Sequence, residues 1–190
     1  MLHETIDTTI ENLKKLKADG ALISAVDEAI AQIVEALVSG KPLMVCGNGG
    51  SAADALHITG ELVGRFNLNR PAMNVICLNA NVTVLTAWSN DIGFESVFSR
   101  QVEAHAQTGA VLWGLSTSGH SPNVLAAFEM ARQHGVLTIG MTGEGGGKLR
   151  NLSDILIASP GKDAPSSQNI HVMLYHYMCQ EIERIVLEKS

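Results

Sequence analysis

The chain has 190 residues, of which 46% are hydrophobic and 17% are charged. Such a composition supplies enough apolar residues for a core, which excludes a disordered chain. The net charge is −6 and the 13 Lys and Arg residues are scattered, so nucleic-acid binding is not expected. The polar N-terminus, MLHETIDTTIENLKK, is unlike a signal peptide, and the apolar runs are shorter than the roughly 20 residues of a membrane span. We therefore expect a soluble, cytoplasmic protein with one domain over residues 1–190.

The three cysteines, Cys46, Cys77 and Cys179, are odd in number and lie in apolar stretches. We interpret them as buried, reduced residues, as is usual in the cytosol. The charged fraction of 17% is below the roughly 25% of typical soluble domains. This difference indicates that self-association hides part of the apolar surface.

Two N-terminal segments, residues 3–19 and 22–39, carry apolar residues at helical spacing. Asp19-Gly20 separates the two segments, and Ser39-Gly40 ends the second. They predict a helical hairpin over residues 1–40, which we assign to oligomerisation.

Residues 41–190 alternate short apolar runs with helical patterns that begin near Ser51, Val82, Glu95, Pro122 and Ser167. The apolar runs are Leu43–Cys46, Met73–Cys77, Val111–Leu115, Leu137–Met141 and Ile155–Ile157. This alternation predicts a three-layer α/β/α sandwich around a central, mainly parallel sheet of five strands. In such sheets the functional site lies beyond the carboxyl ends of the strands.

The first apolar run leads into the glycine loop Gly47–Ser51 and then into a helix. Glycines allow close approach to the backbone, and free N–H groups at a helix start attract anions. The stretch also fits the dinucleotide pattern G-x-G-x-x-A through Gly47, Gly49 and Ala52. That pattern needs an acidic residue about 20 positions later to bind the ribose. No Asp or Glu occurs between Glu61 and Asp91, so the dinucleotide interpretation is disfavoured.

The third run leads into a loop that is rich in hydroxyl groups, Ser116–Pro122. One Ser or Thr is enough to cap the helix that Pro122 begins. Four hydroxyls within six residues favour a phosphate-binding loop over a simple cap.

His57 and Glu61 stand four residues apart on the helix after the glycine loop. This spacing puts an imidazole and a carboxylate on one face, where they suit either a metal ion or an ordinary surface pair. The last helix carries Gln168, His171 and His176 among apolar neighbours, a setting in which a histidine is commonly a core residue.

The segments GNGGSAADALHITGELVGRF (Gly47–Phe66) and STSGHSPNV (Ser116–Val124) resemble the sugar isomerase (SIS) domain family, and within it the phosphoheptose isomerases. The resemblance continues through TAWSND (Thr86–Asp91), FSRQVEA (Phe98–Ala104) and TGEGGGKL (Thr142–Leu149) to the last helix. It implies an aldose–ketose isomerase that converts sedoheptulose 7-phosphate to D-glycero-D-manno-heptose 7-phosphate, the first step of ADP/GDP-heptose biosynthesis. Two alternatives remain: a non-catalytic SIS protein that senses a phosphosugar or binds a partner, and an isomerase of another phosphosugar.

The resemblance assigns roles to particular residues. Glu61 and His176 match the acid–base pair, in which Glu61 moves the C1/C2 proton through an enediol(ate) and His176 serves the sugar oxygens. The implied ligands of one Zn²⁺ per subunit are His57, Glu61, Gln168 and His176. The implied substrate-binding residues are Asn48, Gly49, Gly50, Ser51, Glu61, Asn90, Asp91, Ser116, Thr117, Ser118, Ser121 and Gln168.

Gln168 and His176 are eight residues apart. On one continuous helix they would be separated by about 12 Å along the axis, too far for one metal ion with ligands at about 2 Å. Either Gln168 precedes the regular helix, or the site combines residues of different subunits. The second option agrees with the family resemblance, which implies a homotetramer with active sites between subunits.

The sequence departs from the family pattern at Trp88, which replaces a small residue, and in the segment Ala164–Asn169, which lacks an arginine and contains a proline. These departures predict an altered sugar selectivity with the same type of reaction.

Overall fold

The computed structural model describes residues 1–189 and has one parallel sheet of five strands at its centre. The strand order is β2-β1-β3-β4-β5, and each neighbouring pair is parallel. The strands are β1 (Leu43–Gly47), β2 (Val75–Cys77), β3 (Val111–Ser116), β4 (Leu137–Thr142) and β5 (Ile155–Ala158). The predicted parallel five-stranded sheet is confirmed.

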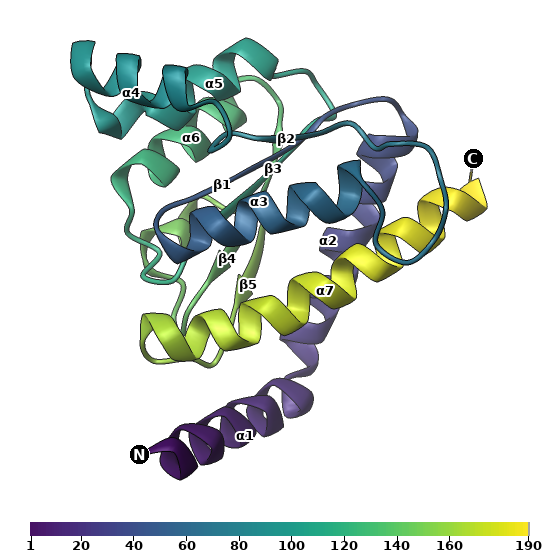
Figure 1. Cartoon of the computed structure of the whole chain (residues 1–190), viewed down its shortest axis with the longest axis vertical. Helices are drawn as coiled ribbons and strands as arrows, with labels where there is room; N and C mark the ends of the chain where they lie inside the picture. The colour runs from purple at the N-terminus through teal and green to yellow at the C-terminus, as the bar shows by residue number, and fades with distance from the viewer. Residues whose placement is uncertain (190) are drawn as a thin grey trace.

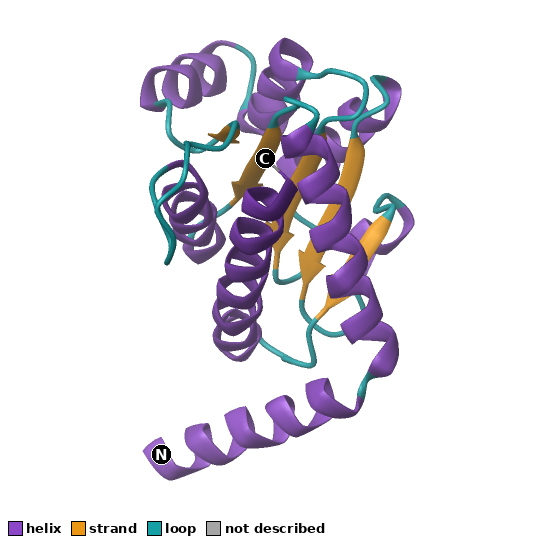
Figure 2. Cartoon of the chain, turned by 90° about the vertical axis from the view of Figure 1, so that its right-hand side faces the viewer, coloured by secondary structure: helices purple, strands orange, loops and turns teal. Residues whose placement is uncertain are grey.

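Helices cover both faces of this sheet, which gives the predicted three layers (Figures 1 and 2). They are α1 (Leu2–Ala18), α2 (Gly20–Val38), α3 (Gly50–Val63), α4 (Val82–Asp91), α5 (Val97–His105), α6 (Pro122–Gln133) and α7 (Ala164–Lys189). Two short 3₁₀ helices complete the set, η1 (Phe94–Ser96) and η2 (Gly147–Asn151). Across residues 1–189, none of the helices combines the length and apolar character that crossing a membrane requires.

Successive side chains of the strands enter two separate cores. On β1, Leu43 and Val45 join the cluster formed with α2, α3 and α7, whereas Met44 and Cys46 join the cluster formed with α5 and α6. This alternation follows from the period of two in a strand. It explains why the strands are continuously apolar, because both faces of the sheet are covered. It also puts α3 and α7 on the same face.

The two N-terminal helices form, but α1 does not fold back along α2. A single residue, Asp19, separates them, and its carboxylate caps α2 by accepting from the Leu22 N–H at 3.0 Å. A helical hairpin needs a loop of about 2–5 residues, so this junction is too short for a closed hairpin. Helix α1 instead extends away from the sheet (Figures 1 and 2). Apolar side chains along it remain exposed, among them Leu2, Ile6 and Ile10.

One buried ion pair holds the loop between α3 and β2. Arg70 Nε lies 3.1 Å from Glu183 Oε1 on α7, and both side chains are only 1% exposed. The Glu183 carboxylate also accepts hydrogen bonds from the backbone N–H groups of residues 66–68. The Arg70 guanidinium donates to the carbonyl oxygens of Glu61 and Leu62, at 2.8 Å each. Arg70 therefore links the C-terminal end of α3 to α7.

The pKa of the Glu183 carboxyl reflects this environment. Burial alone would raise that pKa, but the three backbone N–H groups and Arg70 hold it below its usual value. The carboxylate therefore stays ionised at neutral pH inside the protein.

The three cysteines are free and buried, as the sequence predicted. Burial raises the pKa of each thiol, to about 12 in Cys179. Because the thiolate is the reactive form, these cysteines are chemically inert core residues.

Replacing Glu183 by Gln keeps the side-chain volume but leaves Arg70 buried without its counter-charge. Breaking a buried pair costs about 3–5 kcal/mol, so the free energy of unfolding in urea should fall by that amount at a fixed protein concentration. As a control, Glu103→Gln removes the exposed partner of Arg100 and should cost less than about 1 kcal/mol. Equal stabilities of the two variants would show that the buried pair does not hold the loop.

Candidate active site

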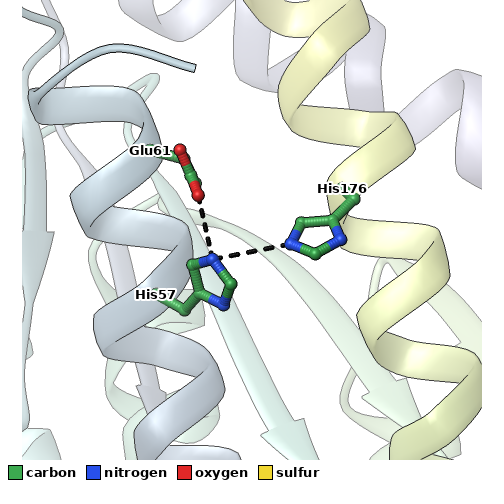
Figure 3. A group of neighbouring side chains, drawn as sticks. All are labelled: His57, Glu61 and His176. Carbon is green, nitrogen blue, oxygen red and sulfur yellow. Dashed lines mark hydrogen bonds and ion pairs between the residues drawn. The ribbon is translucent and has the colours of Figure 1, made fainter. Parts of the chain in front are cut away.

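His57, Glu61 and His176 meet at one point between two helices (Figure 3). His57 Nε2 lies 2.9 Å from Glu61 Oε1 and 3.5 Å from His176 Nε2. One ligand-type atom of each residue lies within 4.8 Å of the others. The structure thus brings together the predicted acid–base pair and three of the four predicted metal ligands.

Two helices, α3 and α7, supply these side chains. His57 and Glu61 occupy neighbouring turns of α3, and His176 projects from α7 toward them (Figure 3). The imidazole rings of His57 and His176 meet edge to face, with centroids 4.9 Å apart. The four-residue spacing predicted a shared face of α3, and the tertiary fold adds the histidine from α7.

The geometry of this group fits a metal ion. Two imidazole nitrogens and a carboxylate oxygen are donors that transition metals such as zinc accept. Ligands at about 2.0–2.2 Å around one tetrahedral ion lie about 3.3 Å from one another. The separations of 2.9 and 3.5 Å are close to that value.

A buried tyrosine and a buried aspartate lie behind His57. The Tyr175 hydroxyl oxygen is 3.0 Å from His57 Nδ1 and 3.5 Å from Asp54 Oδ1. Burial and the neighbouring Asp54 raise the pKa of Tyr175 to about 12, so its hydroxyl keeps the proton at neutral pH. Burial also raises the pKa of Asp54. Neither residue was predicted as part of the site from the sequence.

The glycine loop after β1 is hydrogen-bonded to the start of α6. Gly49 has φ +55° and ψ −122°, a conformation that side chains avoid. Next to it, the Asn48 amide N–H donates to Asn123 Oδ1 at 2.7 Å, and the Asn123 amide donates back to Asn48 Oδ1 at 2.9 Å. Asn123 is 2% exposed and was not among the residues predicted from the sequence.

The hydroxyl-rich loop lies beside the glycine loop, at the carboxyl end of β3. The Ser116 and Ser121 hydroxyls hydrogen-bond each other at 2.9 Å. Ser121 is at the N-cap position of α6, but its side chain makes no capping hydrogen bond there and pairs with Ser116 instead. Gly119, with φ +65°, allows the loop to approach the backbone of Gly146. This arrangement favours the phosphate-binding interpretation over simple capping.

Helix α7 begins at Ala164, earlier than predicted, and includes Gln168. Asp163 explains the early start, because its carboxylate accepts a hydrogen bond from the Ser166 N–H at 2.8 Å. Pro165 falls in the first turn, where the missing N–H has no partner to lose. The option that Gln168 precedes the regular helix is therefore wrong.

Gln168 lies at the far end of the α3–α7 contact from His176. Its amide packs on Gly50 so closely that a Cβ there would lie 2.1 Å from Gln168 Nε2. His176 is eight residues further along the same helix, about 12 Å along its axis. Within one chain, Gln168 therefore does not join His57 and Glu61.

Asn90 and Asp91 also lie apart from this group. They are exposed at the end of α4, where the Asn90 amide donates to Asp91 Oδ1 at 2.8 Å. Helix α4 packs with the core on the other face of the sheet through the partly buried Trp88. The Trp88 indole N–H donates to Ser96 Oγ at 2.8 Å, and the Arg100 guanidinium lies 4.9 Å from its ring centre. Trp88 thus has a packing role in this chain.

His171 is a core residue. It is fully buried, and its Nε2 lies 3.0 Å from the Thr142 carbonyl oxygen and 3.3 Å from Ser159 Oγ. Burial lowers the pKa of His171, so the ring is neutral. The structure therefore separates the two histidines of α7 into one core residue and one site residue.

Comparison with known families adds to this geometry, since residues 6–143 match the family model described as SIS domain. The chain belongs to the SIS domain family. Among relatives of this SIS domain, the phosphoheptose isomerase of Crocosphaera subtropica is 48% identical over 166 residues, which are 87% of this chain and 85% of the relative. That of Synechocystis sp. is 43% identical over 190 residues, which are 100% of this chain and 97% of the relative.

A solved structure agrees with these sequence relatives. The phosphoheptose isomerase from Francisella tularensis superposes on this SIS domain with a TM-score of 0.87 at 32% identity. The match covers 96% of this chain and 94% of that one. The similarity to phosphoheptose isomerases that the two loop segments indicated is confirmed.

Gly50→Ala in this SIS domain should displace the Gln168 amide without unfolding the protein, because the end of a flexible side chain can move away. If Gln168 serves the site, we expect kcat/KM for a phosphoheptose to fall at least about tenfold. Gly60→Ala on the same helix is the matched control, since nothing lies within 4 Å of the added Cβ. It should stabilise the helix by about 0.5–1 kcal/mol and leave the kinetics unchanged. Identical kinetics of the two variants would remove Gln168 from the site.

Proposed function

We propose that this chain is an aldose–ketose isomerase that converts sedoheptulose 7-phosphate to D-glycero-D-manno-heptose 7-phosphate. The proposal rests on three side chains that lie together in an SIS domain. His57 Nε2 is 2.9 Å from Glu61 Oε1 and 3.5 Å from His176 Nε2. The relatives named phosphoheptose isomerase support the choice of substrate. A non-catalytic sensor would not need an acid–base pair at the sugar.

The reaction moves one proton between carbons and one between oxygens. Glu61 takes the proton from C1 of the ketose and delivers it to C2, through an enediol(ate). His176 transfers the hydroxyl proton from the C1 oxygen to the C2 oxygen, so that the carbonyl ends at C1. Glu61 Oε1 faces His57, which leaves Oε2 as the atom that carries the proton.

The loops at the carboxyl ends of β1 and β3 hold the substrate in this proposal. The N-terminus of α6 and the neighbouring hydroxyls bind the phosphate through neutral donors. The phosphate residues are Ser116, Thr117, Ser118 and Ser121. The sugar residues are Asn48, Gly49, Gly50, Ser51, Glu61, Asn90, Asp91 and Gln168.

We further propose that the group binds Zn²⁺, with one ion per subunit. His57, Glu61 and His176 would hold the ion, with Gln168 of a neighbouring subunit as the fourth ligand. A bound Zn²⁺ supplies Lewis acidity toward the oxygen on which negative charge develops. Support comes from the donor set and from the separation of Gln168 from His176 within one chain.

The proposed assembly is a homotetramer with active sites between subunits. Helices α1 and α2, in residues 1–40, make subunit contacts, and residues 41–190 form the α/β core of a single SIS domain. The exposed apolar side chains of α1 support this role. So does an apolar groove between α1, α2 and α7, whose lining includes Leu13, Leu16, Ile23, Val26 and Met173. We place the enzyme in the cytoplasm, at the first step of ADP/GDP-heptose biosynthesis.

Purified protein should convert sedoheptulose 7-phosphate, and Glu61→Gln should lower kcat at least about a hundredfold, because the amide cannot carry the proton. Glu129→Gln, an exposed change on α6, is the control and should keep full activity.

A chelator should lower turnover, and added Zn²⁺ should restore it. An inactive wild-type protein that still binds the phosphosugar would favour the sensor function instead.

Ile6→Asp combined with Ile10→Asp should break the assembly, because two charges would be buried in an apolar contact. Light scattering should give four times the 20.2 kDa subunit mass for the wild type and a lower mass for the variant. Asp7→Asn, also exposed on α1, is the control and should leave the mass unchanged. A monomeric wild-type protein would contradict the proposed assembly.

A further inference from the structure

The two ring nitrogens of His57 face different surroundings. Nε2 points toward Glu61 and His176, whereas Nδ1 is turned away from both (Figure 3). Nδ1 lies 3.0 Å from the hydroxyl oxygen of Tyr175, and that side chain is 1% exposed. The same hydroxyl lies 3.5 Å from Asp54 Oδ1. A buried chain of polar contacts therefore leads from Asp54 through Tyr175 to the site.

The chemistry of these groups sets the direction of the hydrogen bonds. A phenol has one proton to donate, and an ionised carboxylate can only accept. The Tyr175 proton therefore points toward Asp54, and the phenol oxygen accepts a hydrogen bond from His57 Nδ1–H. A neutral imidazole carries one N–H only. His57 Nε2 is thus left with its lone pair directed at Glu61 Oε1.

A metal ion between the two atoms would stabilise this arrangement, and in its absence Glu61 competes with Tyr175 for the His57 proton. A lone pair and a carboxylate oxygen at 2.9 Å repel each other unless a proton or a metal ion bridges them. Buried polar atoms are normally paired, yet Asp54 Oδ2 has no hydrogen-bond partner among the described residues. The Tyr175 hydroxyl, 3.5 Å from Oδ1, is therefore the contact through which this carboxyl group acts on the site.

We infer that Tyr175 is a positioning residue, whose hydroxyl, oriented by Asp54, holds His57 with its proton on Nδ1 and its Nε2 lone pair facing Glu61 and His176. This inference rests on the proposed function, because it concerns the same metal-binding group. Partners behind a ligating histidine set its tautomer and ring orientation, and their loss typically lowers metal affinity about 10–100-fold.

The hydroxyl can be tested separately from the ring. The Tyr175 ring contacts both histidines edge on, with centroids 5.4 Å from His57 and 4.9 Å from His176. Tyr175→Phe keeps these contacts and removes only the hydroxyl. Tyr177→Phe is the matched control, since Tyr177 is on the same helix and 45% exposed.

Two readouts follow, and neither depends on turnover. The first is the dissociation constant for Zn²⁺, from competition with a chromophoric chelator. The second is the tautomer of His57 in metal-free protein labelled with ¹⁵N-histidine, with the signal identified by its loss in His57→Gln. Tyr175→Phe should raise the dissociation constant about 10–100-fold and shift His57 toward the Nε2–H tautomer. Tyr177→Phe should change neither readout.

Asp54→Asn provides a second variant if Tyr175→Phe does not fold, and it should change both readouts in the same direction. Wild-type affinity together with an unchanged tautomer in a folded Tyr175→Phe or Asp54→Asn protein would overturn the inference. If the wild-type protein binds no Zn²⁺, the proposed metal fails, while the tautomer measurement still decides the role of Tyr175.

Discussion

The alignment of α3 with α7 is the constraint on which the candidate site depends. Both helices follow parallel strands and pack on the same face of the sheet, so they run in the same direction. Gly50 meets Gln168 at one end of their contact, and the Arg70–Glu183 pair closes the other. A slip of one residue would move one helix by about 1.5 Å and separate His176 from His57. The buried ion pair therefore belongs to the architecture of the site.

The site is built from polar groups that already have partners within the protein. The amides of Asn48 and Asn123 bond each other, the Ser116 and Ser121 hydroxyls form a pair, and Tyr175 supports His57. A side chain that is held before the substrate arrives loses less conformational entropy on binding. The network thus fixes the two loops and the group of His57, Glu61 and His176 in position, as the proposed function requires.

Within a single chain, only some of the predicted site residues lie close together. Gln168 is near the start of α7, eight residues before His176, and Asn90 and Asp91 are on α4, which packs on the other face of the sheet. At the same time α1 presents apolar side chains to solvent. These features have one common explanation in the proposed assembly, in which neighbouring subunits cover α1 and supply the missing side chains.

The sequence by itself determined the layered α/β fold, the positions of the two loops and the pairing of His57 with Glu61, because these follow from short-range periodicity and spacing. It also predicted the SIS family through the glycine-loop and hydroxyl-loop segments. The resemblance also implied that His57 and His176 share one site. Only the tertiary structure showed that the two meet within one chain, that His171 is a core residue, and that Asn123 and Tyr175 contact residues of the site. The same holds for the open N-terminal helices, which the sequence predicted as a hairpin. Contacts between residues more than a hundred positions apart depend on how helices pack across a sheet, and local patterns carry no information about that packing.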